Sequence, residues 1–471
     1  MKQSLFLLLF VGCQCVLYGQ GRLLSFEEVL RQMKQNNRSL KIAAKNVEVA
    51  RAERDKLRAA WYPSLQSYGT FVHLSEAIEV RQSLSTLTEP AKAWVQEWLP
   101  DDQLITGILN EVGRQTLAFP LTPRNLTDIG LNAEWVLFSG GKRIRASRIG
   151  ERLVETAREA KEEEVSAQWI ALVESYFGLR LAQEVVQVRR ETFRSLTYHY
   201  NNALKLEAVG MIDKAGRLFA QVNKDEAQRE LEAAQKDIGV LQRALLSVMG
   251  QSDDSRMESD SIFSTTPLFI HWELPDKEIF RQLLQMDNPN LNQLRLQEEI
   301  AHHQLRIEQS GYLPDIALFG KQTLYSHGIA SNLMPRTMIG IGFTWNLFDG
   351  TAREQRIRQA KLTRQNLVLG KEKVSEDLYV ALDKLYTQLQ KAQENVRTLN
   401  ETIALNEELV RIRSKSFAEG MATGSDVVDA ETMLAAVRVA RLSAYYEYDV
   451  ALIHLLALCG IPEKFQSYPK Q

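Results

Sequence analysis

Two long stretches of the chain carry apolar residues at the spacing of an α-helix, with charged residues filling the other positions. Residues 142–206 and residues 353–418 share this pattern and contain no proline. A helix of about 65 residues is roughly 100 Å long, so these helices must pack along one another as in a coiled coil. The apolar positions that define the first stretch are Leu153, Val154, Ala157, Val165, Trp169, Leu172, Val173, Tyr176 and Leu179.

A short break with a glycine follows each long stretch, and a second helical pattern follows each break. The breaks lie at Gly210 and Gly420, and the second helices are predicted at residues 213–249 and 426–458. Short connections join antiparallel neighbours, so the pattern predicts two long helical hairpins. Two further helices are predicted at residues 25–62 and 276–312.

The segments before the long helices alternate between apolar and polar residues, which predicts β-strands. Residues 127–138 and 337–348 alternate over ten positions, whereas residues 64–74 and 315–325 alternate less cleanly. One face is strongly apolar, and the other carries Gly, Asn, Thr and acidic residues. That pattern fits a membrane barrel with a polar lumen, although a soluble sandwich face gives the same alternation. Trp135 and Trp345 lie at the helix-proximal strand ends, where an interfacial aromatic belt is expected.

These elements occur twice along the chain. The segment "LFSGGKR" at Leu137 returns as "LFDGTAR" at Leu347, an offset of 347 − 137 = 210 that holds to Gly250 and Gly460. Upstream, "NNRSL" matches "DNPNL" at an offset of 251, so the first copy holds 251 − 210 = 41 extra residues between its strands. A repeat of this length is a duplicated structural module.

The predicted layout follows from this repeat. It places a signal peptide at residues 1–19, a first repeat at 20–250 and a second repeat at 276–460. The first repeat holds an insertion at 75–124 and a hairpin tip at 209–211. The second holds strands at about 315–325 and 337–348 and a tip at 419–421. An inter-repeat linker at 251–275 and a tail at 461–471 complete the chain.

The amino terminus and the composition restrict the class of protein. Net charge is −2 over 471 residues, which argues against a nucleic-acid partner. The longest apolar stretch, residues 5–18, is too short to span a membrane and is typical of a secretory signal cleaved after Gly19. Cys13 and Cys15 lie in that signal, so only Cys459 remains and no internal disulfide is expected. Lipidation of Cys13 is an alternative for the same segment.

Four strands per chain cannot close a barrel, and an open edge facing lipid is prohibitive. The chain is therefore expected to oligomerise through its strands. Two copies would give the smallest known barrel, and three would give twelve strands and twelve helical columns.

The order of these segments resembles the TolC family of outer-membrane efflux proteins. The segments that carry the resemblance are "SFEEVLRQMKQNNRSL" at Ser25, "WNLFDGTAREQRI" at Trp345 and "FAEGMATGSDVVDAETMLAAV" at Phe417. The resemblance implies a mixed α and β membrane protein. In it, a trimeric 12-stranded β-barrel in the outer membrane continues into a long periplasmic α-helical coiled-coil barrel.

The resemblance also implies a function and partners. It implies an exit duct without catalytic residues, metal or cofactor, which docks to a periplasmic adaptor (membrane fusion protein) and an inner-membrane pump of the RND or ABC type. Outer-membrane lipid and two further copies of the chain complete the expected partners. The alternatives are the outer-membrane component of a type I polypeptide exporter and a soluble periplasmic coiled-coil scaffold. No catalytic or metal-binding motif supports an enzyme.

Candidate sites lie at the two hairpin tips. The residues expected to contact the adaptor are Val209, Gly210, Met211, Glu419, Gly420 and Met421. Asp426 and Asp429 lie one turn apart on a helix, and by resemblance they match paired aspartates that ring a closed periplasmic mouth. Asp426 could equally be a first-turn acid that stabilises its helix.

The tip departs from the family at three positions. Phe417 and Ala422 stand where family members carry a Tyr and an Arg that lock the mouth, and Gly216 replaces the matching acid in the first copy. A closed state must therefore rest on other contacts, with Asp213, Lys214 and Arg217 as nearby candidates.

The insertion is expected on the extracellular side, because it joins the strand ends distal to the helices. Its apolar positions predict an amphipathic helix. It could plug the mouth, pack between protomers or touch the lipid rim. The positions are Trp94, Trp98, Leu104, Ile108 and Val112.

Overall fold

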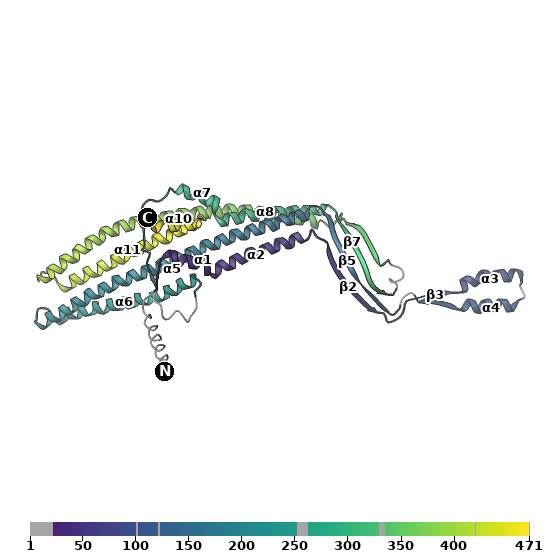
Figure 1. Cartoon of the computed structure of the whole chain (residues 1–471), viewed down its shortest axis with the longest axis horizontal. Helices are drawn as coiled ribbons and strands as arrows, with labels where there is room; N and C mark the ends of the chain where they lie inside the picture. The colour runs from purple at the N-terminus through teal and green to yellow at the C-terminus, as the bar shows by residue number, and fades with distance from the viewer. Residues whose placement is uncertain are drawn as a thin grey trace, which may run out of the picture. The chain divides into compact units, whose positions relative to one another are not determined.

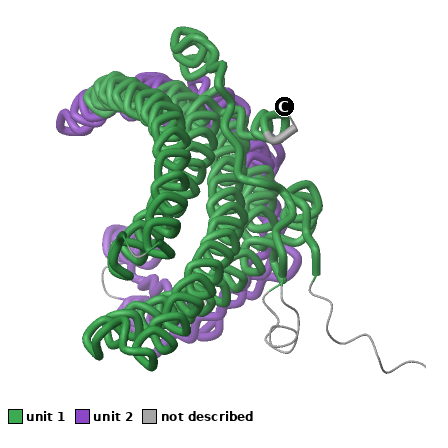
Figure 2. The backbone as a smooth tube through the Cα atoms, turned by 90° about the vertical axis from the view of Figure 1, so that its left-hand side faces the viewer, with its two compact units in different colours: residues 1–53, 151–301, 362–471 green, residues 54–150, 302–361 purple. Residues whose placement is uncertain are grey.

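The computed structural model describes residues 22–99, 102–120, 123–251, 262–328, 335–419 and 421–470. The predicted signal peptide, with Cys13, lies outside these residues. The chain forms two compact units (Figure 2). Unit 1 holds residues 1–53, 151–301 and 362–471, and unit 2 holds residues 54–150 and 302–361.

Four long helices form the two predicted hairpins (Figure 1). Helix α5 (Lys142–Ala208) and α10 (Ala352–Ala418) have 67 residues each, and α6 (Lys214–Val248) and α11 (Gly424–Leu458) have 35 residues each. Each element of the first hairpin thus has a partner of identical length in the second, as the 210-residue offset predicts. Within the described residues, no helix contains an apolar stretch able to traverse a lipid bilayer.

The helices predicted at residues 25–62 and 276–312 are each broken in two, so the prediction of single helices was wrong. The structure has α1 (Phe26–Asn36) and α2 (Arg38–Ala59), and α7 (Lys277–Asp287) and α8 (Pro289–Gln309), with a short η2 turn (Ser310–Tyr312) after α8. Asn37 (φ −55°, ψ 127°) and Asn288 (φ −65°, ψ 117°) stand at the two breaks in non-helical backbone conformations.

The two asparagines make the same contacts. The side-chain oxygen of Asn37 accepts from Leu40 N at 3.0 Å, and that of Asn288 accepts from Leu291 N at 2.9 Å, so each caps the following helix. Their amide groups donate to the last carbonyls of the return helices, Val248 O at 2.8 Å and Leu458 O at 2.7 Å. Each break thereby satisfies an orphan carbonyl at the end of α6 or α11.

Unit 1 is closed by the segment between the repeats. Strand β6 (Ile262–Ser264) pairs in parallel with β1 (Arg22–Leu24), and the C-terminal η3 turn (Pro462–Lys470) follows α11. Aromatic side chains fill the core beneath this segment, with Phe26, Phe177 and Phe465 in mutual contact and Trp169 and Tyr176 fully buried.

One buried carboxyl lies in this core. Asp449 on α11 is 0% exposed, and neither of its carboxyl oxygens has a hydrogen-bond partner of good geometry among the described residues. Burial raises the pKa of the Asp449 carboxyl well above its usual range, and the facing backbone N–H of Phe269 offsets only part of that effect. The neighbouring Tyr448 donates to His271 O at 2.9 Å, which holds the inter-repeat segment against α11.

Unit 2 is built on a four-stranded antiparallel sheet with the order β2-β5-β7-β8. Its strands are β2 (Ser64–His73), β5 (Asn125–Ser139), β7 (Asp315–His327) and β8 (Thr337–Thr344). The two copies meet where β5 pairs with β7, in a register that sets Glu134 opposite Phe319.

Strand β8 ends four residues before the predicted boundary at 348. Its last residue, Thr344, pairs with Asp315, which is the first residue of β7. Residues 345–348 therefore extend past the end of their neighbour and have no ladder to join. Alternation in the sequence continued beyond the point where a partner exists.

The insertion is a β-ribbon that carries two helices, so the prediction of one amphipathic helix was wrong. Strands β3 (Glu79–Ser83) and β4 (Thr116–Pro120) pair, and between them lie α3 (Ser85–Trp98) and α4 (Gln103–Arg114). A proline follows Leu99 in the sequence and disfavours helix there. Asp102 then caps α4 by accepting from Leu104 N and Ile105 N, both at 3.1 Å.

Candidate functional site

The two hairpin tips share one turn geometry. At the first tip Gly210 has φ +74°, and Met211 N donates to Leu206 O at 2.9 Å. At the second tip Met421 N donates to Ser416 O at 2.8 Å, which is the same i to i−5 closure. Gly420 lies outside the described residues. The two methionines thus occupy equivalent positions, and both are 72% exposed.

The other tip residues differ in exposure and type. Val209 is exposed beside Met211, and Glu419 is exposed beside Met421. Methionine and valine side chains at a convex tip offer an adaptable apolar contact surface. The structure therefore brings the predicted tip residues to the ends of the two hairpins, without testing what they contact.

The return helices begin with different caps. On α6 the N-cap Asp213 accepts from Gly216 N at 2.8 Å. On α11 the N-cap is Thr423, and Asp426 closes a capping box by accepting from Thr423 N at 2.8 Å. Gly216 and Asp426 are equivalent at the 210-residue offset, so the acid has moved by three residues between the copies and caps the helix in both.

This geometry gives Asp426 a local role. Hydrogen bonds from the Thr423 hydroxyl and backbone lower the pKa of the Asp426 carboxyl, and Arg413 at 3.6 Å lowers it further. Asp426 is therefore ionised and held by its own helix start. Asp429, one turn later, is exposed. The expected carboxylate ring needs neighbouring chains, so it remains a prediction for both residues.

The first hairpin is also held by an ion pair that the second lacks at the equivalent positions. Arg217 at the start of α6 contacts Glu207 at the end of α5 at 2.7 Å. The equivalent residues of the second hairpin are Phe417 and Val427, and Val427 is fully buried. Two apolar residues thus stand at these positions in the second copy, where Arg413 and Asp426 form the ion pair between the helices instead, at 3.6 Å. Arg217, one of the nearby candidates, links the two helices of the first hairpin.

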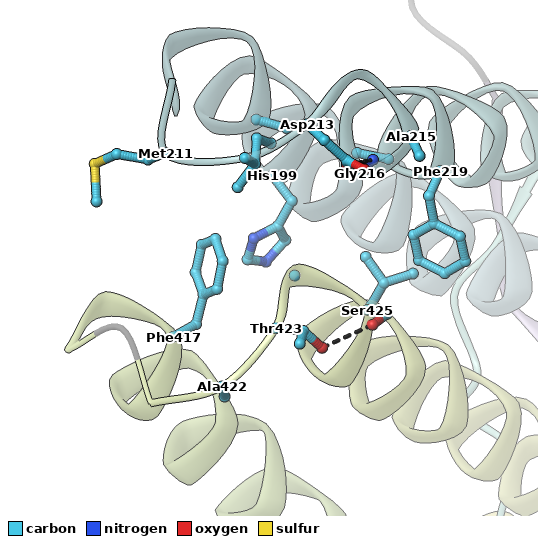
Figure 3. A pocket seen from close by; sticks show the side chains of 15 residues that line it. His199, Met211, Asp213, Ala215, Gly216, Phe219, Phe417, Ala422, Thr423 and Ser425 are labelled. Carbon is cyan, nitrogen blue, oxygen red and sulfur yellow. Dashed lines mark hydrogen bonds between the residues drawn. The ribbon is translucent and has the colours of Figure 1, made fainter. Parts of the chain in front are cut away.

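A cavity of about 730 Å³ lies between the ends of the two hairpins (Figure 3). Both hairpins line it, with Met211 and Phe219 from the first and Phe417 and Ala422 from the second. Phe417 and Ala422 are the two departures from the family lock, and here they form cavity wall. His199 also lines the cavity. Burial is the main cause that lowers the pKa of its imidazole, and the charge of Glu431 opposes that shift. Neither Asp426 nor Asp429 lines it.

The strand ends in unit 2 carry a joint that is repeated in both copies. Trp135 Nε1 donates to Trp61 O at 3.0 Å, and Trp345 Nε1 donates to Tyr312 O at 3.2 Å. Trp61 and Tyr312 each lie three residues before the strand that follows, β2 or β7. Each predicted belt tryptophan therefore ties a strand end to the preceding helix-to-strand turn, and remains about half exposed.

An arginine completes each joint. Arg143 stacks over Trp61 with 4.5 Å to the ring centre and donates to Leu137 O at 2.7 Å. Arg353 stacks over Tyr312 at 4.0 Å and donates to Asn346 O at 3.1 Å. A guanidinium can satisfy carbonyls and cover an aromatic face at once. Sequence reasoning missed these arginines, although both lie in the repeated segments "LFSGGKR" and "LFDGTAR".

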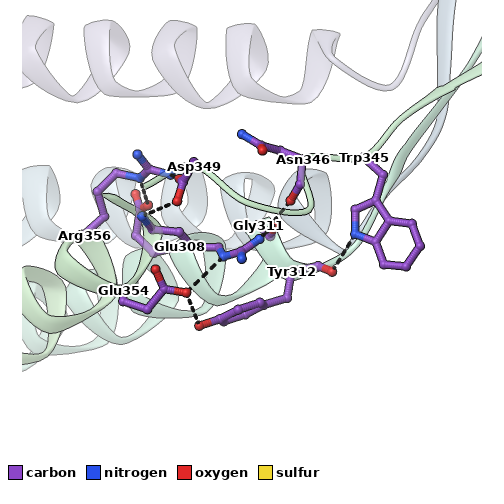
Figure 4. Close-up of polar contacts among 9 residues, drawn as sticks. Glu308, Gly311, Tyr312, Trp345, Asn346, Asp349, Glu354 and Arg356 are labelled. Carbon is purple, nitrogen blue, oxygen red and sulfur yellow. Dashed lines mark hydrogen bonds and ion pairs between the residues drawn. The ribbon is translucent and has the colours of Figure 1, made fainter. Parts of the chain in front are cut away.

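In the second joint, carboxylates extend this network (Figure 4). Asp349 accepts from the backbone N of Arg353 at 3.2 Å and pairs with Arg356 at 3.1 Å. The backbone hydrogen bond, followed by Arg356, lowers the pKa of the Asp349 carboxyl. Tyr312 donates its hydroxyl to Glu354 at 3.0 Å. The start of α10 is thus fixed to the strand ends by several charge-assisted bonds.

The apolar face of the sheet is exposed. Ile339, Ile341 and Phe343 alternate along β8 and are each about 70% exposed or more. Gly340 lies on the other face, where a Cβ would stand 2.6 Å from the ring of Phe319. Among the described residues, β2 and β8 each have a single neighbour, so both edges of the sheet are unpaired within one chain.

The family model "Outer membrane efflux protein" matches residues 280–461. The fold of the whole chain is that of solved outer-membrane channels. CusC superposes with a TM-score of 0.71 at 16% identity, covering 93% of this chain and 92% of that chain. Residues 280–461, less than half of the chain, thus match the outer membrane efflux protein family. The match and the superposition bear out the resemblance to the TolC family, and the predicted combination of long helices with a four-stranded sheet is confirmed. The trimer and its closed barrel remain predictions.

Two further solved structures share this fold. The outer membrane protein VceC of Vibrio cholerae superposes with a TM-score of 0.70 at 17% identity, over 93% of this chain and 96% of that chain. The outer-membrane channel OprN superposes with a TM-score of 0.72 at 16% identity, over 92% and 89%. These matched folds are those of channel proteins.

In sequence, the chain is similar to the alkaline protease secretion protein AprF of Pseudomonas aeruginosa. The two are 24% identical over 312 residues, which cover 62% of this chain and 61% of AprF. The match thus spans less than two thirds of that relative. The efflux protein family model itself covers the second copy of the repeat, whereas the structural likeness covers both copies.

Proposed function

We propose that three copies of this chain form an outer-membrane channel that serves as the exit duct of a tripartite efflux system. The observation that carries the proposal is the open sheet of unit 2, whose edge strands β2 and β8 have no second neighbour among the described residues. In hydrocarbon each unpaired backbone group costs several kcal/mol. Pairing β8 of one copy with β2 of the next removes both edges, and three times four strands gives twelve.

The exposed apolar face supports a lipid environment for this sheet. Ile339, Ile341 and Phe343 would face hydrocarbon, and the glycines between them would face the lumen. The half-exposed Trp135 and Trp345 lie at the strand ends nearest the helices, where the lipid headgroups would begin. The protein is accordingly placed in the outer membrane, with its helical part in the periplasm.

The hairpin tips are the proposed contacts for a periplasmic adaptor and, through it, an inner-membrane pump. The exposed side chains of Val209, Met211 and Met421 supply apolar surface there, with Glu419 beside them. Gly210 supports the turn by its positive φ, and Gly420 is the equivalent residue in sequence. The channel is proposed to be passive, so the energy for export must come from the pump.

A ring of carboxylates at the periplasmic mouth is proposed from Asp426 and Asp429. Three chains would bring six carboxylates around one axis, where they would attract cations. Asp426 is engaged in its capping box, whereas Asp429 is exposed and has no capping role. Asp429 is therefore the better probe of the ring.

Polypeptide export is the second candidate, because the similar sequence AprF is described as a protease secretion protein. A type I exporter would place the same duct above an ABC-type pump. A soluble periplasmic scaffold is disfavoured, since it would leave the apolar face of β8 in water.

The test is conductance of the purified protein in a planar lipid bilayer, with native mass spectrometry of the same sample. A trimer with discrete conductance steps is expected. Recovery of the folded protein from the periplasm without detergent would overturn the proposal.

The carboxylate ring is tested in the same bilayers. Asp429→Asn should reduce cation selectivity and block by divalent cations. The matched control is Asp377→Asn, an exposed carboxylate on α10 about 40 residues from the tip. Equal cation selectivity in Asp429→Asn and in the control would contradict the proposed carboxylate ring.

A further inference from the structure

The insertion of the first copy is an ordered projection with a built connection to the sheet. The β3–β4 ladder continues through Leu84 N, which donates to Gln115 O at 3.1 Å, directly below the two helices. Figure 1 shows α3 and α4 side by side at the end of this ribbon. The ribbon therefore carries the helix pair as one folded element.

The helix pair has almost no core of its own. Within α3 and α4 the buried residues are Thr88, Val95 and Gly113. Gly113 lies so near Thr88 that a Cβ on it would stand 2.5 Å from the Thr88 hydroxyl. Helices of 14 and 12 residues are marginal by themselves. Such a pair needs further apolar burial to be stable.

Each helix carries an apolar stripe beside this contact. On α3, Leu87, Trp94 and Trp98 fall within about 40° of one another at about 100° per residue, and Trp98 is 67% exposed. On α4 the exposed stripe consists of Leu104, Ile108 and Val112.

The two stripes fall on the same face of the pair. Each is displaced from its helix–helix contact in the same rotational sense when viewed from its own amino terminus. Because α3 and α4 run antiparallel, that displacement brings both stripes to one side. The result is a continuous exposed apolar face of six large side chains.

The charge of the insertion disfavours a lipid surface as the occupant of this face. Residues 75–124 hold seven acidic and four basic residues, a net charge of 4 − 7 = −3. Three of the four cations are already paired with a neighbouring acid: Arg81 with Glu79, Lys92 with Glu89, and Arg114 with Glu111. Helices that lie on anionic membrane surfaces instead carry a lysine- and arginine-rich polar face.

A second copy of the chain fits better. In the proposed trimer, on which this inference rests, three hairpins project from the same end of neighbouring strand pairs. The links are short, five residues between β2 and β3 and four between β4 and β5. Short tethers give effective concentrations in the millimolar range, so even a modest apolar face associates.

We infer that the α3–α4 hairpins of three copies pack through these apolar faces into a six-helix bundle at the outer mouth of the channel. Each hairpin then gains the core it lacks, and the tryptophans become buried between chains. The insertion is thus an interaction surface between copies of this chain, distinct from the edge strands β2 and β8.

Cysteine cross-linking of the purified trimer tests this arrangement. Trp98→Cys places a thiol on the apolar face, and Gln96→Cys places one about 160° away on the polar face of the same helix. The native Cys459 does not compete, because it is buried and burial raises the pKa of its thiol to about 12. A short bismaleimide is added, and inter-chain products are separated by denaturing electrophoresis.

About tenfold more inter-chain product is expected from Trp98→Cys than from Gln96→Cys, because the millimolar effective concentration acts on one face only. Leu87→Cys, eleven residues earlier on the same stripe, serves as a second probe if Trp98→Cys does not fold. Equal product from both faces, or none from either stripe position in an intact trimer, would overturn the inference.

Two further readouts keep the alternatives apart. The first readout is the quenching of tryptophan fluorescence by brominated lipid, measured on the wild-type protein and on a Trp94→Leu, Trp98→Leu variant. Quenching that is present in the wild-type protein and lost in the variant would show that lipid covers the face. That result would also overturn the inference. A monomer in native mass spectrometry would instead contradict the proposed function itself. The two failures are therefore distinguishable.

Discussion

Replacing the buried Asp449 by Asn should stabilise the protein, and the gain should grow with pH. The side chain is 0% exposed and lacks hydrogen-bond partners of good geometry in the described structure, and burial raises the pKa of its carboxyl. The folded state therefore holds a proton at pH values where the unfolded chain has lost it. Stability contributed by the protonated form is complete below the usual carboxyl pKa and declines as pH rises toward the folded-state pKa.

The size of the effect follows from this difference in bound protons. Each pH unit in that window lowers the unfolding free energy of the wild-type protein by about 1.4 kcal/mol per chain. With an unfolding entropy of about 2.1 cal/mol/K per residue, a chain of this length shifts its melting temperature by about 1.5 °C per pH unit. A cooperative trimer shows the same shift, because the free energy and the entropy scale together.

The assay is thermal unfolding of the wild-type protein and Asp449→Asn in detergent at pH 5, 6, 7 and 8, followed by intrinsic tryptophan fluorescence. The difference between the two melting temperatures should increase with pH. The exposed Asp377→Asn should give no such trend. Parallel pH profiles for the wild-type protein and Asp449→Asn would refute the reasoning, whatever their absolute separation.

Three further outcomes follow from the repeated contacts. Asn37→Ala and Asn288→Ala should each lower the unfolding free energy by about 1–3 kcal/mol, since each leaves a helix carbonyl unpaired; clearly unequal costs would contradict their equivalence. Gly460→Ala should abolish or greatly reduce the yield of folded protein, because Gly460 has φ +73° and a Cβ there would stand 2.2 Å from a backbone oxygen. Gly370→Ala is the control: its Cβ would meet nothing within 4 Å, so it should stabilise its helix by up to about 1 kcal/mol in a melting assay. Trp345→Phe keeps an aromatic side chain but loses the indole N–H and its hydrogen bond, so the heat resistance of the trimer on gels should fall by an amount equivalent to about 1 kcal/mol. Unchanged resistance would show that this joint does not stabilise the trimer.

The periodic parts of the fold could be predicted from the sequence because they are long and uninterrupted. Helices α5 and α10 each run for 67 residues with apolar residues at helical spacing, so the helical period dominates any local preference. The alternation of apolar and polar residues predicted β5 and β8 equally well. It did not predict where β8 ends, because the end of β8 is set by where β7 begins, which is a property of the partner strand.

The breaks at Asn37 and Asn288 could not be predicted from periodicity, since the apolar pattern runs on across them. They are fixed by carbonyls more than 160 residues away, at the ends of α6 and α11. A signal was nevertheless present. Both copies carry Asn followed three residues later by Leu, and the second adds a proline at the first helical position.

The contacts of the candidate residues could be predicted only in part, and their proposed roles in the channel stay predictions. The sequence placed Asp426 near the tip, and the structure adds that it closes the capping box of α11. Phe417 and Ala422 were recognised as lost lock residues, and their contribution to a cavity depends on the facing hairpin. Tertiary partners of this kind leave no local trace in the sequence.

The two unlike edges of the sheet have a genetic consequence. In the proposed trimer each interface joins β8 of one chain to β2 of the next, so every subunit presents two different surfaces and the contact is head to tail. A chain with a damaged β8 edge but an intact β2 edge would still enter a ring and then prevent its closure. Co-expressed at equal levels with the wild-type chain, it would leave only about one assembly in eight free of a defective subunit. Edge mutations in this protein are therefore expected to be dominant, while mutations that unfold the chain are expected to be recessive.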